Sequence, residues 1–232
     1  MRTSGPDVLK VLARSTVALL CVLTLASCDA GDPEAQIDHL CEIAPSSDEE
    51  VLLREILHTE DIKTQITSRT SRVVEKLQGD LREMGPEKRT LPAHTCAFWP
   101  GQEKSERATF SFGWVPRAVK DKDAEGALPN GVPYEVNGIL GESTDTYTKL
   151  YVQCDMPGDL GQASKAAWLY ANASYPVDVP RTDNDRAARD RQTALTYLMA
   201  RRVTDALGCE NKPLEKAPVV RPVPSPSPSP SP

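Results

Sequence analysis

Histidine and cysteine are the residue types in this 232-residue chain whose spacing could support chemistry. Three histidines occur, His39, His58 and His94, and two of them precede a cysteine by two positions, in His39-Leu-Cys41 and His94-Thr-Cys96. Imidazole and thiolate ligands together suit zinc or copper. If Cys41 and Cys96 meet in space, four ligands converge, so one hypothesis is a metal-handling protein outside the cytoplasm.

Familiar motifs of catalysis and phosphate binding are missing from the chain. It has no Gly-x-Ser-x-Gly, Ser-x-x-Lys or His-Glu-x-x-His motif and no glycine-rich phosphate loop. Carboxylates are numerous, but at helix starts and on polar faces they are usually solvated. We therefore expect no enzyme, no catalytic residue and no cofactor, and an uncharacterised enzyme stays the weaker alternative.

The start of the chain has the zones of a secretory leader. A segment with Arg2, Lys10 and Arg14 precedes an uncharged, mostly apolar run of 12 residues, 15–26. A bilayer core needs ~20 helical residues, so this run is too short to span it. Runs of this length are typical of signal peptides.

The apolar run ends in Leu25-Ala26-Ser27-Cys28, which resembles the lipobox of bacterial lipoproteins. In that family the cysteine receives a diacylglycerol and a peptidase cuts before it. The resemblance covers only residues 1–28. It implies that residues 1–27 are removed and that Cys28 carries a palmitate-type lipid anchor. Two acyl chains give stable attachment, so we expect the chain to be held on the outer face of the cell membrane.

Four cysteines follow the expected anchor: Cys41, Cys96, Cys154 and Cys209. An even number in an oxidising compartment predicts two disulfides and leaves their pairing open. We favour Cys41–Cys96 and Cys154–Cys209, because each pair would join a helix end to a strand. A bond between Cys41 and Cys96 would remove the thiolates that the metal hypothesis needs.

The mature chain is acidic. Its leader holds three basic residues and one acidic residue, so 24 basic and 32 acidic residues remain and the net charge is −8. Nucleic acid repels such a chain, and no Lys/Arg cluster with interleaved aromatics overrides this. We expect no nucleic-acid partner. The partners that remain are the membrane, through the anchor, and a protein, a cell-wall component or a small apolar ligand.

Two helical regions follow from capping and periodicity. Ser47 and Glu50 form a capping box, and apolar residues then recur at steps of three and four as far as Gly85-Pro86. His58-Thr59 could divide this region into two helices. A last helix should begin near residue 182 and end at Gly208.

Between the helical regions the period becomes that of strands. We predict strands at 92–99, 107–116, 133–140, 146–154 and 165–175. The segments after Cys96 and Cys154 are alike, each with a Pro-Gly turn and then a strand that holds a tryptophan, which favours two similar hairpins. Aromatic residues at strand spacing pack a sheet more often than they line a ligand pocket; in this chain they are Trp99, Trp114, Trp168, Tyr134, Tyr147, Tyr151, Tyr170 and Tyr175.

These patterns predict an α+β fold, with a mainly antiparallel sheet of about five strands flanked by an N-terminal and a C-terminal helical segment. The expected organisation is a signal peptide at 1–27, an anchored linker at 28–34, one disulfide-bonded domain at 35–214 and a disordered Pro/Ser-rich tail at 215–232. Lipobox, disulfide-type cysteines and Ser-Pro tail together resemble actinomycete surface lipoproteins. The leading hypothesis is a non-catalytic, lipid-anchored binding domain outside the cytoplasmic membrane.

Overall fold

The computed structural model describes residues 40–101, 107–120, 128–176 and 186–223. Over these residues the chain has an α+β fold, with a single antiparallel sheet of eight strands and five α-helices. No helix in this part of the chain is long and apolar enough to cross a membrane. The predicted fold class is confirmed, but the sheet has eight strands where about five were expected.

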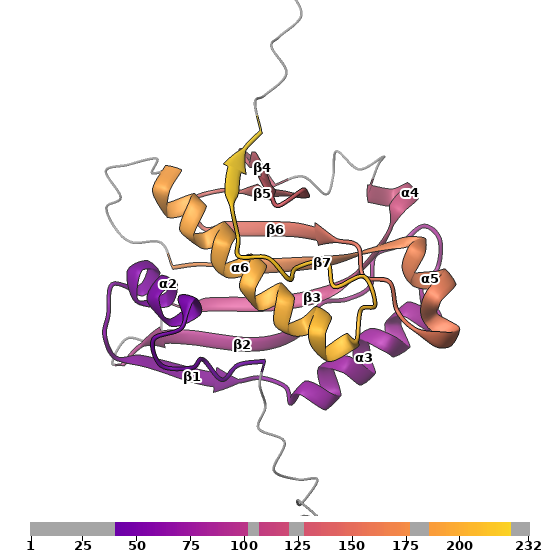
Figure 1. The fold of residues 1–232 in the computed structure, drawn as a ribbon, viewed down its shortest axis with the longest axis horizontal. Coiled ribbons are helices and arrows are strands. Elements are labelled where there is room, and N and C mark those ends of the chain that lie inside the picture. Colours follow the sequence, from indigo (N-terminus) through magenta and orange to yellow (C-terminus); the bar gives the residue numbers. More distant parts are fainter. Residues whose placement is uncertain (1–39, 102–106, 121–127, 177–185, 224–232) are drawn as a thin grey trace, which may run out of the picture. The chain divides into compact units, whose positions relative to one another are not determined.

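The sheet has the longest strands at its centre and short strands at its edges (Figure 1). In spatial order the strands are β1 (Ile62–Ile66), β2 (Ala93–Pro100), β3 (Ala108–Pro116), β7 (Ala167–Ser174), β6 (Tyr147–Val152), β5 (Ile139–Ser143), β4 (Val132–Val136) and β8 (Val220–Pro222). The helices are α2 (Asp48–Leu57), α3 (Thr70–Glu83), α4 (Arg117–Lys120), α5 (Gly161–Lys165) and α6 (Arg186–Leu207).

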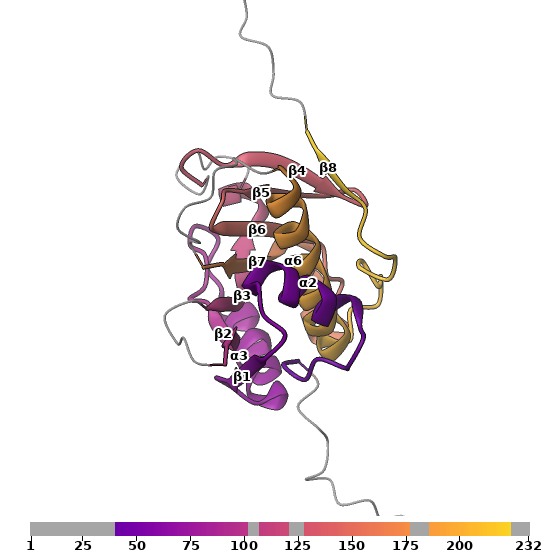
Figure 2. The same ribbon diagram turned by 90° about the vertical axis from the view of Figure 1, so that its left-hand side faces the viewer.

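Three helices, α2, α3 and α6, cover one face of the sheet (Figures 1 and 2). The indole Nε1 of Trp114 on β3 donates a hydrogen bond to Leu77 O on α3 at 2.8 Å. The hydroxyl of Tyr175, just after β7, donates to Gln192 O on α6 at 2.7 Å. We call the opposite side the open face. The short α4 lies against it, where Val119 packs beside a small cluster of side chains from β3, β6 and β7.

The hydrophobic core lies between the sheet and these helices. Successive side chains of a strand point to opposite faces, and in β3 the side chains of Phe110, Phe112 and Trp114 are all at most 1% exposed. Phe110 makes edge-to-face ring contacts with Phe98 and Tyr175, each at 6.0 Å between centroids. Phe110, Phe112 and Trp114 therefore share the face of β3 that is turned toward the core.

Two disulfides join the segments that the sequence suggested. Cys41 is bonded to Cys96 in β2, and Cys154, just after β6, is bonded to Cys209. Gly208 ends α6 with a positive φ of 71°, the left-handed conformation that glycine adopts at a helix end, and this turns the chain so that Cys209 meets β6. Both predicted pairings are confirmed.

The two similar hairpins that the sequence favoured lie side by side at the centre of the sheet. They are β2–β3 and β6–β7, joined through the pairing of β3 with β7. Their tryptophans differ in orientation, because Trp114 pairs in register with Leu169 and Trp168 pairs with Val115. Trp114 is therefore in the core, whereas Trp168 lies on the open face.

Two predictions about secondary structure were wrong. Ile62 and Ile66 were assigned to a helical stripe, but they bound the edge strand β1, because His58 adopts a positive φ of 48° and ends α2. The single strand predicted at 133–140 is a hairpin of β4 and β5, whose turn at Asn137-Gly138 has positive φ at both residues. This is the backbone that two-residue hairpin turns require.

The predicted tail begins too early. Residues 220–222 form β8 and pair with β4. The connection from α6 to β8 is held by polar contacts: Tyr197 donates to Lys216 O at 3.1 Å, and the Asn137 side chain donates to Ala217 O at 2.8 Å. The described part of the fold therefore extends to residue 223.

Each disulfide should contribute strongly to stability, because each closes a long loop. Both bonds link residues 55 positions apart, for which the chain-entropy model gives roughly 4 kcal/mol. We expect the paired substitutions Cys154→Ser and Cys209→Ser to lower the free energy of unfolding by about this amount in denaturant titrations. Reductant should destabilise the parent further than it destabilises this variant. An unchanged midpoint would contradict the assignment.

Candidate functional site

The structure separates the residues of the metal hypothesis. Cys28 and His39 lie outside the described residues. Cys41 and Cys96 are bonded to each other, so neither supplies a thiolate, and His94 stands exposed on β2. Within the described ranges no group of three or more His, Cys, Asp or Glu side chains is placed to hold a metal ion.

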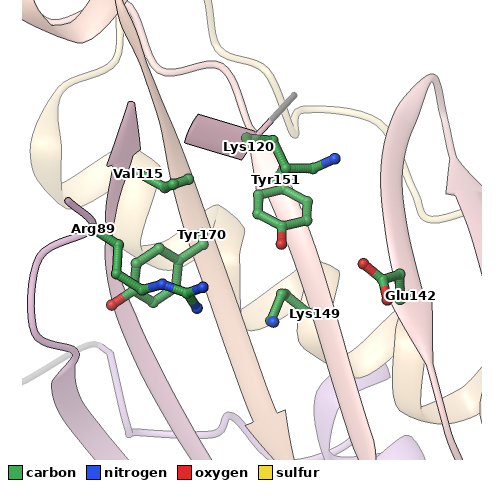
Figure 3. A pocket seen from close by; sticks show the side chains of 7 residues that line it. All are labelled: Arg89, Val115, Lys120, Glu142, Lys149, Tyr151 and Tyr170. Atoms are coloured by element: carbon green, nitrogen blue, oxygen red, sulfur yellow. The ribbon is translucent and has the colours of Figure 1, made fainter. Parts of the chain in front are cut away.

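A small pocket lies on the open face of the described structure (Figure 3). Its lining comes from five structural elements and one loop, and consists of Arg89 before β2, Val115 on β3, Lys120 on α4, Glu142 on β5, Lys149 and Tyr151 on β6, and Tyr170 on β7. We call this the cationic pocket, since three of its seven side chains are basic and one is acidic.

Strand register brings the central residues of the pocket together. Lys149 pairs across strands with Glu142, and Tyr151 pairs with Tyr170. Directly opposite residues on neighbouring strands have Cβ atoms ~4.5–5.5 Å apart, so a pair of oppositely charged residues lies beside a pair of aromatic residues. In Figure 3 the hydroxyl of Tyr151 and the carboxylate of Glu142 both point toward the ammonium group of Lys149.

Tyr170 forms one wall because the neighbouring strand has no side chain in its way. It pairs with Gly113 on β3, and a Cβ atom at Gly113 would overlap the Tyr170 ring and its hydroxyl. The Tyr170 hydroxyl donates to Thr90 O at 2.7 Å. Burial raises the pKa of Tyr170 to about 12, so the hydroxyl keeps its proton at neutral pH and holds the loop that carries Arg89.

Lys149 is far more buried than lysines usually are. It is only 8% exposed, although it lies on the open face. Burial lowers the pKa of Lys149, and the nearby charges of Arg89 and Lys120 lower it further, while Glu142 acts in the opposite direction. Lys120 also places its ammonium 4.7 Å from the centroid of the Tyr151 ring. The pocket thus concentrates positive charge on an acidic protein.

The acidic group of the pocket is already engaged. Glu142 Oε2 accepts a hydrogen bond from the backbone N–H of Leu128 at 2.6 Å. The cavity between the lining side chains has a volume of about 20 Å³ for the centre of a water molecule, where one buried water needs ~10–15 Å³. The pocket can therefore hold one small polar group, and its charge suits an anion.

The aromatic residues at strand spacing divide between the two faces. Trp114, Tyr134 and Tyr175 are buried in the core, as expected for sheet packing, whereas Tyr151 and Tyr170 line the pocket. Sequence reasoning missed the charged members of the pocket. One signal was present: Lys149 interrupts the apolar strand of β6, where a charged residue needs a specific environment.

Comparison with models of protein families, with curated proteins and with solved structures gave no match for this chain.

The environment of Lys149 predicts how stability depends on pH. Its pKa is lower in the folded protein than the usual 10.5, so the folded state binds the proton less well than the unfolded state does. The resulting stability is fully present above pH 10.5 and is lost as the pH falls through the folded pKa. We expect the melting temperature of the parent, minus that of Lys149→Met, to rise between neutral pH and pH 10.5.

Taking a difference removes the contributions that the two proteins share, such as the titration of the tyrosines. Lys216→Met is the matched control, because Lys216 is exposed and follows α6, away from the pocket. Buffers should contain neither phosphate nor carboxylate. A parent-minus-variant difference that stays level with pH for Lys149→Met would mean that the pocket does not disfavour the charged lysine.

Proposed function

We propose that this chain is an exported, membrane-anchored lipoprotein whose folded domain binds a ligand outside the cytoplasmic membrane without catalysing a reaction. Cys28 carries the lipid, and residues 1–27 are removed. The observation that carries the proposal is the Leu25-Ala26-Ser27-Cys28 sequence after a basic start and a 12-residue apolar run. In this proposal the anchor keeps the domain at the outer face of the membrane.

The two disulfides support an extracytoplasmic location. All four cysteines that follow Cys28 are bonded in pairs, and structural disulfides persist in oxidising compartments. The same bond between Cys41 and Cys96 weighs against the metal-handling alternative, since it occupies the thiolates. The described lining of the pocket contains no serine, cysteine or histidine, so it offers no serine–histidine or cysteine–histidine pair in support of an enzyme.

The open face is the binding surface in this proposal. The helices α2, α3 and α6 cover the other face, and ligand sites combine apolar walls with a few convergent polar groups. The cationic pocket has this composition: Val115, Tyr151 and Tyr170 form walls around charged groups, and all three are less than 9% exposed.

Lipidation can be tested in the bacterium by labelling with a radioactive fatty acid. We expect the full chain to take up label and to partition into detergent, and intact-mass analysis to find a mature chain that begins at Cys28 with a diacylglyceryl adduct. Cys28→Ser should abolish labelling, because serine supplies no thiolate for the thioether bond. Cys21→Ser is the matched control and should leave labelling intact, because Cys21 lies in the segment to be removed.

Two results would overturn the anchoring proposal. One is a native protein that retains residues 1–27 without a fatty adduct, and the other is labelling that survives Cys28→Ser.

A further inference from the structure

We propose that the cationic pocket binds the anionic end group of its ligand, a phosphate or a carboxylate, between Arg89, Lys120 and Lys149. This names the ligand class for the open face and so rests on the proposed binding role, but it does not depend on the lipid anchor. The end group sits in the pocket against Tyr151 and Tyr170, and the remainder of the ligand extends over the open face.

Charge supports an anion. Three basic side chains and one carboxylate form the described lining of the pocket, in a chain whose net charge is −6. Burial, and to a smaller extent the charges of Arg89 and Lys120, disfavour the protonated form of Lys149, while Glu142 acts in the opposite direction. An anion bound among these groups offsets the cost of the buried positive charge. A bound anion also favours the protonated form of Lys149, which strengthens the interaction in turn.

Size limits what enters the pocket. The cavity volume of about 20 Å³ admits one or two water molecules by the same measure, so a whole metabolite does not fit inside. An oxygen atom of a carboxylate or phosphate group is about the size of a water molecule, so one or two such oxygens can enter the space. Arg89 is exposed at the rim, and a guanidinium can bind such a group through two parallel hydrogen bonds.

The neighbouring row of polar residues extends the site. Lys149 pairs in register with Asn172 on β7, whose Oδ1 atom is buried and has no hydrogen-bond partner within the described residues. Buried polar atoms normally have a partner. An amide oxygen accepts hydrogen bonds, so Asn172 Oδ1 would pair with a donor group in the remainder of the ligand and not with its anionic end.

Titration of the full chain, purified in detergent, with inorganic phosphate and with acetate tests the proposal. We expect saturable binding of at least one anion, followed by calorimetry or by the rise in melting temperature. Lys149→Gln should weaken binding about tenfold or more, since a hydrogen bond to a charged group contributes ~1.5–3 kcal/mol. Lys149→Arg, which keeps the charge, should retain part of the affinity. Glu142→Gln should strengthen binding, because it removes the acidic group from the described lining.

Lys216→Gln is the matched control, because it removes the same charge at an exposed position after α6, and it should leave binding unchanged. Binding of phosphate but not acetate assigns the pocket to a phosphate group, and the reverse assigns it to a carboxylate. Circular dichroism of each variant shows whether it is folded.

The proposal is overturned if neither anion binds, or if folded Lys149→Gln binds as the parent does. That failure is distinct from failure of the proposed anchoring, which labelling measures and which does not involve the pocket. Conversely, if the protein carries no lipid at Cys28 but binds phosphate, the anion-binding proposal is supported and the anchoring proposal is contradicted.

Discussion

The helices α2, α3 and α6 cover one face of the sheet, whereas among the described residues the other face carries only the four-residue helix α4, and the rest of the structure follows from this arrangement. Side chains alternate along each strand. The residues that face the helices must therefore be apolar, whereas the residues on the open face can be polar or charged. In β6, Leu150 faces the core and is fully buried, while its neighbours Lys149 and Tyr151 point to the open face. A shift of one residue in register would send Lys149 into the core, where an unpaired charge is very costly. The position of the lysine is therefore tied to the register of the sheet.

The central hairpins maintain this register from both sides. β3 pairs with β7 over eight residues, from Thr109–Ser174 to Pro116–Ala167. One disulfide is attached to Cys96 in β2, and the other to Cys154, just after β6. Because β3, β7, β6 and β5 are consecutive in the sheet, residues that are distant in sequence arrive on one patch of the open face. Gly113 allows Tyr170 to lie across β3, and the resulting wall supports the loop of Arg89 through Thr90.

Several features of the fold could be predicted because local chemistry determines them. Ser47 accepts a hydrogen bond from Glu50 N at 3.3 Å, as the capping box implies, and the aromatic residues of β3 follow a strict period of two. β1 was missed because Ile62 and Ile66 are four residues apart, a spacing that a helix and a strand both permit. β8 was missed because it is three residues long in a proline-rich segment and exists only through its pairing with β4. In both cases long-range pairing outweighed the local pattern.

The cationic pocket was beyond prediction for a related reason. Lys149 was visible as a charged residue in an apolar strand, but Arg89 and Lys120 belong to a loop and a four-residue helix whose positions no periodicity determines. Bringing Lys149, Arg89 and Lys120 together affects the free energy of folding, and this effect cannot be read from the sequence. A lysine that is 8% exposed loses hydration on folding, and the charges of Arg89 and Lys120 add to this cost while Glu142 offsets part of it. Groups whose pKa values are perturbed cluster at functional sites, and this connects the folding of β6 with the binding that we infer for the open face.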